Sequence, residues 1–118
     1  RFIGASNVIK GTARDADHVS FAGATLRVTG ARLAAGQSAA VAIRQHDIQL
    51  STQAPVASEN TIKATVARQV YLGANRDYVV ETTDGTSLRV VTPTETAVGK
   101  GSEVWLTLPP DRCRALER

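Results

Sequence analysis

The sequence predicts an all-β fold made of small β-barrels. Apolar and polar residues alternate with a period of two over much of the chain, whereas the 3.6-residue period of an amphipathic helix is hard to find. Glycine, threonine and an Asp-Gly pair recur between the alternating runs, which is typical of short strands joined by tight turns. The two halves of the chain also share an ordered set of short motifs. Together these observations indicate a repeated β architecture.

Residues 60–73 form the clearest predicted strand. Two sets of side chains alternate along it, and we expect the apolar set to face the core. The apolar set is Ile62, Ala64, Val66, Val70 and Leu72, and the opposite set is Lys63, Thr65, Gln69 and Tyr71. Arg68 alone interrupts the apolar face.

A β-hairpin is predicted over residues 77–91. Asp84 and Gly85 both tolerate positive φ angles, so we expect a two-residue type I′ turn between the strands. Weaker strands are predicted at residues 7–13, 18–22, 24–28, 38–45 and 103–108, and one short helical turn near the C-terminus.

Two related units are predicted, over residues 1–57 and 58–118. The motif NVIKGT at Asn7 returns as NTIKAT at Asn60, 53 residues later, and the triplet Leu-Arg-Val at 26–28 returns at 88–90, 62 residues later. The second unit therefore carries about nine extra residues, in the stretch YLGANRDYVVE. After each triplet come a glycine, a short apolar strand and an aspartate, in the same order: Gly36, Val41, Ile43 and Asp47, then Gly101, Val104, Leu106 and Asp111. The alternative is a chance coincidence of short β motifs, against which the ordered matches argue.

Each unit is too small to bury a secure core alone, so we expect the two to pack together. Five short strands in each unit suit a small Greek-key barrel of the OB type. The predicted architecture is therefore a tandem of OB-like barrels packed together.

Composition limits the function classes. With 42% hydrophobic and 21% charged residues among 118, the chain is an ordinary globular domain, and no apolar run approaches the roughly 20 residues of a membrane-spanning helix. The net charge of +3 is spread along the chain, and only the tail DRCRALER clusters arginines. Cys113 is the single cysteine, which favours a reducing cytoplasm and an inert thiol. Because the chain holds no methionine, we expect Arg1 to follow a segment of a longer protein.

A corner is predicted near residues 45–47. Val41 and Ile43 share one face of a strand, whereas Ile48 and Leu50 continue on the opposite parity, so the strand must break between the two pairs. Arg44, His46 and Asp47 lie at this break. Arg44 has the chemistry to clamp an anion or a carboxylate, and its alternative role is to tie a neighbouring acidic loop.

Catalytic and metal-binding motifs are not evident. The sequence has no GxxxxGK[ST] phosphate loop, and its two histidines, His18 and His46, do not occur in a zinc-binding spacing. Neighbouring side chains in a strand point to opposite faces, so His46 and Asp47 form a dyad only if the strand breaks there. We expect no catalytic residue, no metal site and no bound cofactor in this chain.

Nucleic-acid binding is not favoured. Single-strand binding by an OB barrel needs aromatic residues beside a basic groove, and none of the strands carries two aromatics on one face with basic residues between them. Trp105 has the opposite parity to its apolar neighbours, so we expect an exposed packing or interface residue.

Four motifs in order resemble the C-terminal TOBE (transport-associated OB) region of ATP-binding subunits of ABC importers. They are FIGASN followed by Gly11, VAIRQHDIQL, VYLGANRDYVV with its glycine-tipped hairpin, and a Gly-x-x-Val strand ending in Pro-Pro-Asp. The resemblance covers nearly the whole chain and is greatest to the spermidine/putrescine, ferric iron and phosphonate importer branches.

The resemblance implies a non-catalytic regulatory and dimerisation domain of a cytoplasmic ATPase subunit. ATP and Mg²⁺ would be bound by a preceding domain, and FIGASN would be the junction. The implied partners are a second ATPase subunit, the permease subunits at the inner membrane and a small ligand, with no nucleic acid. Candidate ligand or interface residues are Ser6, Asn7, Arg44, His46, Asp47 and Trp105.

One departure affects the site. Where the family usually has Arg-Pro-Glu, this chain has Arg44, Gln45 and His46, so the arginine carries over but the glutamate does not. A histidine there would make the contact sensitive to pH. The alternative function is a free-standing small-oxyanion binder of the molybdate type, with Ser6, Lys10 and Lys63 as its donors; an independent enzyme ranks last.

Overall fold

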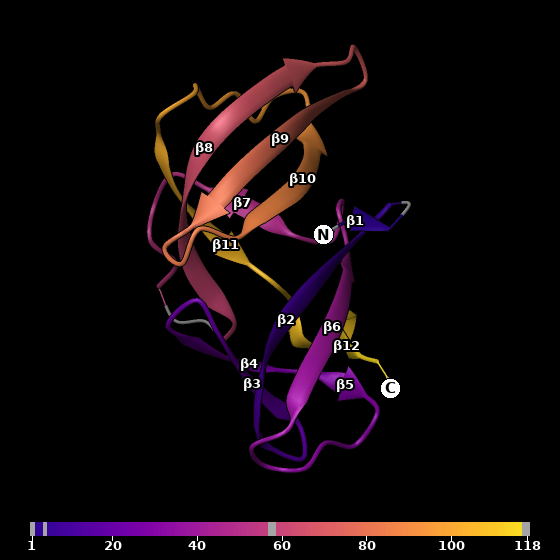
Figure 1. Ribbon diagram of the computed structural model, residues 1–118. Helices are drawn as coiled ribbons and strands as arrows, with labels where there is room; N and C mark the ends of the chain where they lie inside the picture. The colour runs from indigo at the N-terminus through magenta and orange to yellow at the C-terminus, as the bar shows by residue number, and fades with distance from the viewer. Residues whose placement is uncertain (1, 4, 57–58, 117–118) are drawn as a thin grey trace.

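The computed structural model describes residues 2–3, 5–56 and 59–116 and is all-β, which confirms the predicted fold class (Figure 1). The elements are β1 (Phe2–Ile3), β2 (Ser6–Asp15), β3 (His18–Phe21), β4 (Ala24–Arg27), β5 (Thr29–Gly30), β6 (Ser38–Arg44), β7 (Gln49–Ser51), β8 (Thr61–Tyr71), β9 (Asn75–Thr82), β10 (Ser87–Pro93), β11 (Glu103–Thr107), the 3₁₀ turn η1 (Pro110–Arg112) and β12 (Arg114–Ala115). They build two OB-like barrels packed together.

The strands form two curled sheets. The first has the order β4-β3-β2-β6-β12-β5, with β1 paired to β2, and the second has the order β10-β9-β8-β11-β7. Each half of the chain places one short strand in the other half's sheet: β7 pairs with β11, and β12 pairs with β6. The sequence analysis predicted neither of these short strands. The exchange means that neither sheet is complete without the other half.

One apolar core joins the two sheets. Along β6 the side chains of Ala39, Val41 and Ile43 are buried in alternation with more exposed ones, as the period of two predicts. Residues from β2, β8, β10 and β11 join the same buried cluster. The predicted packing of the two barrels is therefore a shared core.

The predicted faces of β8 are correct only as far as Val66. The pairing of β8 with β9 shifts between Val66, opposite Val80, and Arg68, opposite Val79, so a β-bulge reverses the facing of all later residues. Val70, predicted on the core face, lies opposite Asp77 and is only half-buried, and Leu72, just beyond the strand, is 59% exposed. The bulge also turns Arg68 outward, which removes the apparent interruption of the apolar face.

The turn between β9 and β10 differs from the predicted two-residue type I′ turn. Gly85 N donates to Thr82 O at 3.0 Å, and Thr82 N donates to Thr86 O at 2.9 Å, so the loop holds three residues. Among the described residues of this loop only Gly85 has a positive φ, of 87°. This is a type I turn closed by one left-handed residue, for which Asp84 needs no unusual conformation.

The repeated motifs meet each other across the two halves. Asn7 is fully buried, and its side-chain amide donates to Arg89 O at 2.8 Å while its oxygen accepts from Arg89 N at 2.9 Å. Asn60 makes the same pair of bonds to Arg27, each at 2.8 Å. Each asparagine thus binds the Leu-Arg-Val triplet of the other half. The division into units at 57/58 stays a prediction, because that boundary lies outside the described residues.

Candidate functional site

The predicted corner is confirmed at the end of β6. The strand ends at Arg44, residues 45–47 form a turn, and β7 enters the other sheet at Gln49. Backbone hydrogen bonds fix the corner: Gln45 N donates to Ala5 O at 2.9 Å, and Gln45 O accepts from Val91 N at 3.1 Å. The corner is therefore bonded to the segment that precedes β2 in one sheet and to β10 in the other.

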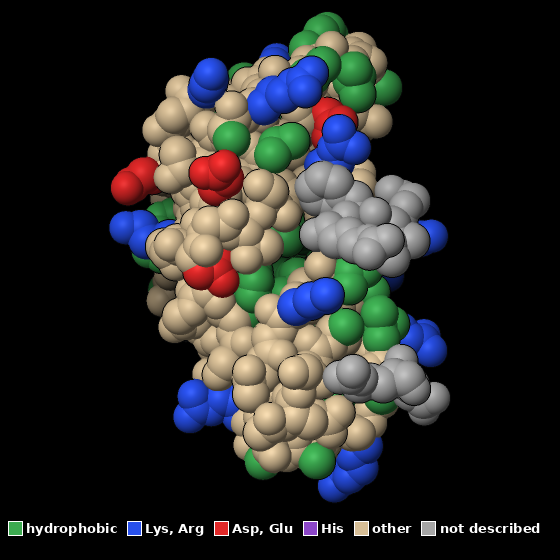
Figure 2. Space-filling view, in the orientation of Figure 1, with side chains coloured by type: hydrophobic (Ala, Val, Ile, Leu, Met, Phe, Trp, Pro, Cys, Tyr) green, Lys and Arg blue, Asp and Glu red, His purple; other side chains and the backbone are tan. Residues whose placement is uncertain are grey.

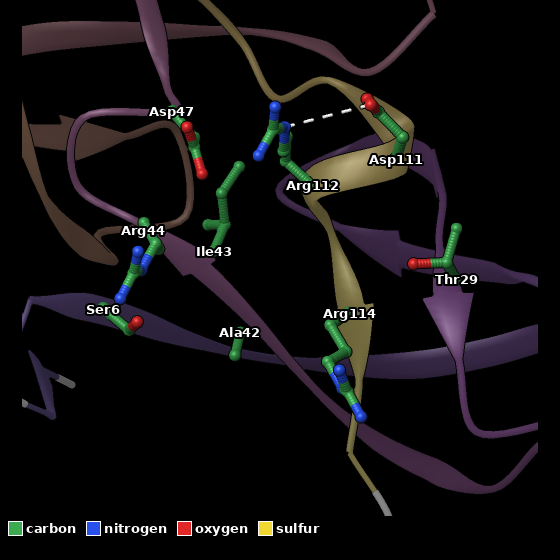
Figure 3. Close-up of a pocket in the computed structure, with 9 residues that line it drawn as sticks. All are labelled: Ser6, Thr29, Ala42, Ile43, Arg44, Asp47, Asp111, Arg112 and Arg114. Atoms are coloured by element: carbon green, nitrogen blue, oxygen red, sulfur yellow. Dashed lines mark ion pairs between the residues drawn. The ribbon is translucent and has the colours of Figure 1, made fainter.

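A groove of about 370 Å³ lies beside this corner (Figure 3). Its lining comes from the start of β2, from β5, from the end of β6 and its turn, and from η1 and β12. The lining residues are Ser6, Thr29, Ala42, Ile43, Arg44, Asp47, Asp111, Arg112 and Arg114. The strand exchange that brings β12 beside β6 is what joins the two ends of the chain here.

Three arginines and two aspartates line the groove. Arg44 stands opposite Ser6 in the β2–β6 register, and in Figure 3 its side chain extends beside Ser6. In the same view the side chains of Arg112 and Asp47 both point toward the space above Ile43. The pair between Arg112 Nε and Asp111 Oδ2 is 3.8 Å long and both side chains are largely exposed, so it neutralises Arg112 only weakly. The groove can therefore accept a small anion or a carboxylate.

The wall behind the groove is fixed by backbone and hydroxyl hydrogen bonds. Thr29 N and Oγ1 both donate to Cys113 O, at 2.8 and 3.1 Å. Burial raises the pKa of the Cys113 thiol to about 11, so this thiol stays protonated near neutral pH. Cys113 is a packing residue of the wall and has no nucleophilic character.

The structure brings together three of the predicted site residues, Ser6, Arg44 and Asp47. His46 lies at the same corner, with Nε2 3.7 Å from Asp47 Oδ1, and its side chain is largely exposed. His46 and Asp47 can approach each other because residues 45–47 form a turn, whereas neighbouring side chains in a continuous strand would point to opposite faces.

Two predicted site residues lie elsewhere. Asn7 is buried, and its side chain is hydrogen-bonded to the backbone of Arg89 in the other half. Trp105 lies on β11, half-buried, with Lys63 Nζ 5.1 Å from its ring centroid. The site role of these residues stays a prediction, and of the donors named for an oxyanion only Ser6 lines the groove.

Sequence reasoning did not place Thr29, Asp111, Arg112 and Arg114 in the site. The arginine cluster of the tail DRCRALER was the available signal. The sequence did not show which residues this tail contacts, because only the antiparallel pairing of Arg114 with Ala42 brings the tail beside the corner.

A small group of metal-type ligands occurs at the turn between β2 and β3. Atoms of Asp15, Asp17 and His18 lie within 4.8 Å of one another, and His18 Nδ1 is 2.8 Å from Asp15 Oδ1 and 3.0 Å from Asp17 Oδ1. The hydrogen bond to Asp15 raises the pKa of His18. The three side chains are already tied to one another in an exposed turn, and a metal-free turn remains our prediction.

The fold and the groove define a tandem OB-like protein with a candidate binding site between its halves. The chain belongs to the family described as TOBE domain, because its residues 41–116 match the model of that family. Among the described residues, no helix is both long enough and apolar enough to cross a bilayer.

Two similar curated proteins are spermidine/putrescine import ATP-binding proteins PotA. The one from Frankia alni is 27% identical over 134 residues, and the one from Thermobifida fusca is 29% identical over 125 residues. Both alignments take in 98% of this chain but only 29% and 32% of the relatives. The chain thus spans about a third of the length of the curated relatives that it matches.

A solved structure shares the fold. The cytoplasmic molybdate-binding protein ModG, crystallised with molybdate bound, superposes with a TM-score of 0.84 over 96% of each chain, at 18% sequence identity. This similarity establishes the tandem OB-like fold independently of the family match.

Proposed function

We propose that the chain is the non-catalytic C-terminal regulatory and dimerisation domain of an ABC importer ATP-binding subunit. The observation that carries this proposal is the alignment of nearly the entire chain with about a third of two import ATP-binding proteins. ATP and Mg²⁺ would be bound by another domain of the subunit. The subunit would pair with a second copy and with permease subunits, on the cytoplasmic side of the inner membrane.

The groove supports a sensing role. Arg44 comes from the corner of the first half, and Arg112 and Arg114 come from the last segment of the second half. An anion bound to both sets would hold the halves together through charge-assisted hydrogen bonds. A ligand that binds one arrangement of the halves better than another shifts the balance between them, which is the physical requirement for regulation.

The complete reading frame tests the proposal directly. We expect it to encode a GxxxxGK[ST] phosphate loop and the other ATPase motifs upstream of FIGASN. The purified full-length subunit should hydrolyse ATP, and the isolated chain should not. A frame that encodes this domain alone would refute the importer assignment.

Dimerisation is tested on the isolated chain. We expect at most a weak dimer in sedimentation equilibrium, because the ATPase domains would supply much of the contact in the full subunit. A dimer that persists at micromolar concentrations, with an obligate-type interface above about 2,000 Å², would contradict this expectation.

A small-oxyanion binder is the second candidate function. The similarity in fold to a molybdate-binding protein and the three arginines of the groove favour it. Titration calorimetry with molybdate, sulfate and phosphate should then give saturable binding that Arg44→Gln weakens about tenfold. Arg68→Gln, an exposed change outside the groove, is the matched control. Absence of binding of all three anions, measured at two temperatures so that a binding enthalpy near zero is not missed, would count against this candidate and leave the first untouched.

A further inference from the structure

Asp47 and Arg112 occupy equivalent places in the two halves. Asp47 N donates to Arg44 O at 3.0 Å in the turn before β7. Arg112 N likewise donates to Pro109 O at 2.9 Å in the turn before β12. Each turn leads into the short strand that pairs with the sheet of the other half. The two side chains carry opposite charges and point toward the same space, so the groove presents a cation and a carboxylate to one ligand (Figure 3).

The Asp47 carboxylate is enclosed but weakly paired. Its side chain is 16% exposed, and its one ion pair within the described residues is with His46, at 3.7 Å. This distance exceeds the length of a hydrogen bond, and the His46 side chain is itself 58% exposed. The carboxylate oxygens therefore keep lone pairs for a hydrogen-bond donor in the groove.

The other charges of the groove favour an anion. Arg44, Arg112 and Arg114 against two aspartates leave the lining with one excess positive charge. Asp111 is paired with Arg112 at 3.8 Å, and its side chain is 79% exposed, so water screens its charge. Asp47 is thus the acidic group that a bound anion would meet in a poorly hydrated place.

The surface suits a small anion better than a polyanion. On the face shown in Figure 2, the described Lys and Arg side chains are scattered among Asp and Glu and form no continuous stripe. A polyanion needs an extended track of positive charge, whereas a small anion needs only the few arginines of one groove. The ligand is therefore sought among small oxyanions.

An oxyanion without a proton meets Asp47 unfavourably. Sulfate and molybdate carry no proton near neutral pH, so an oxygen turned toward Asp47 would repel the carboxylate. Hydrogen phosphate has both kinds of group. Its O–H can donate to the carboxylate, while its other oxygens accept charge-assisted hydrogen bonds from the arginines.

We propose that the groove binds a phosphate group that keeps a proton, and that Asp47 selects this group over sulfate and molybdate. The inference rests on the second candidate function, anion binding in the groove, and names the ligand of that site. The groove volume of about 370 Å³ is at the small end of ligand pockets, which suits inorganic phosphate or a small phosphate monoester.

NMR titration of the chain near pH 7 tests the selection in the groove itself. The 118-residue chain contains every lining residue and a core of its own. The Nε–H signals of Arg44 and Arg112 should shift saturably with sodium phosphate, and sulfate and molybdate should bind at least about tenfold more weakly. Monofluorophosphate resembles hydrogen phosphate in shape but has no O–H near neutral pH, so it should bind as weakly as sulfate.

Glycerol phosphate distinguishes the source of the phosphate group. Tighter binding of glycerol phosphate than of inorganic phosphate would assign the groove to a phosphate monoester, and weaker binding would assign it to inorganic phosphate.

Asp47→Asn gives the selection a second test. The asparagine amide supplies N–H donors, so sulfate should bind about tenfold more tightly to this variant than to the wild type, and the preference for phosphate should disappear. Asp111→Asn removes the same charge from the exposed aspartate of the groove and is the matched control. It should change the affinities for phosphate and sulfate alike and leave their ratio unchanged. Urea unfolding checks that each variant is folded, and the monofluorophosphate comparison needs only the wild type.

The possible failures are distinguishable. Equal affinities of the wild type for phosphate, sulfate and monofluorophosphate would overturn the selection but leave the groove an anion site. A preference for phosphate that persists in folded Asp47→Asn would overturn the role of Asp47. Absence of shifts with every anion would overturn the inference together with the second candidate function.

Discussion

Replacing Asn60 by alanine should destabilise the protein more than almost any other single polar change. Asn60 is only 4% exposed, and its side chain accepts from Arg27 N at 2.8 Å and donates to Arg27 O at 2.8 Å and Leu108 O at 2.9 Å. Its backbone is left-handed, with φ of 59°. The side chain therefore satisfies three backbone groups from two distant segments, and its own backbone favours asparagine over alanine.

The magnitude follows from these contacts. Three hydrogen bonds at about 1 kcal/mol each, plus about 1 kcal/mol for alanine in the left-handed region, give a loss of about 4 kcal/mol for Asn60→Ala. Asn60→Gly keeps the backbone conformation, so it should cost about 3 kcal/mol. Asn7→Ala removes two bonds, to Arg89, and should cost about 2 kcal/mol.

Urea unfolding followed by circular dichroism measures these differences. The expected order of stability is wild type, then Asn7→Ala, then Asn60→Gly, then Asn60→Ala. If Asn60→Ala and Asn7→Ala both stay within about 1 kcal/mol of wild type, the two asparagines do not hold the halves together and the argument fails.

Three further predictions concern single sites. Gly11→Ala should destabilise by about 1–3 kcal/mol, because its Cβ would clash with the backbone oxygen of Ser20 in β3. Gly99→Ala, whose Cβ would meet no neighbour within 4 Å among the described residues, should be neutral in the same unfolding assay. Cys113 should resist Ellman's reagent in the native protein at pH 8, since its pKa is about 11, and should react only in denaturant; rapid labelling of the folded protein would contradict its burial. The NMR titration of His18 should give a pKa above its ordinary value of about 6.5, and Asp15→Asn should lower this pKa. The contribution of protonated His18 to the free energy of unfolding is present below about pH 6.5 and is lost as the pH rises through the raised pKa. An unchanged His18 titration in Asp15→Asn would exclude the hydrogen bond as the cause.

The local pattern of the sequence was enough to predict most strands. Alternation along β6 and the first part of β8 arises because neighbouring side chains point to opposite faces and one face is buried. The change of parity after Ile43 required the corner for the same reason. The repeat of Asn7 at Asn60 also marked two buried positions, although their bonds to the opposite triplets were not foreseen.

Features that depend on distant contacts needed the tertiary structure. The bulge in β8 is set by pairing with β9 and has no local signal, so the facing of Val70 was predicted wrongly. The three-residue turn at Gly85 is likewise a choice of register, because Asp-Gly suits both turn types.

The candidate site shows the same division. Its first-half residues, Ser6, Arg44 and Asp47, were predicted from the corner and the family resemblance. Arg112 and Arg114 joined them only through the short strand β12, whose two residues are too few to show any period. By itself the sequence determined the fold class, most strands and the corner, because a strand with one buried face alternates apolar and polar residues along the chain. Only the tertiary structure decided the strand exchange and the groove, because each depends on pairing between residues far apart in the chain.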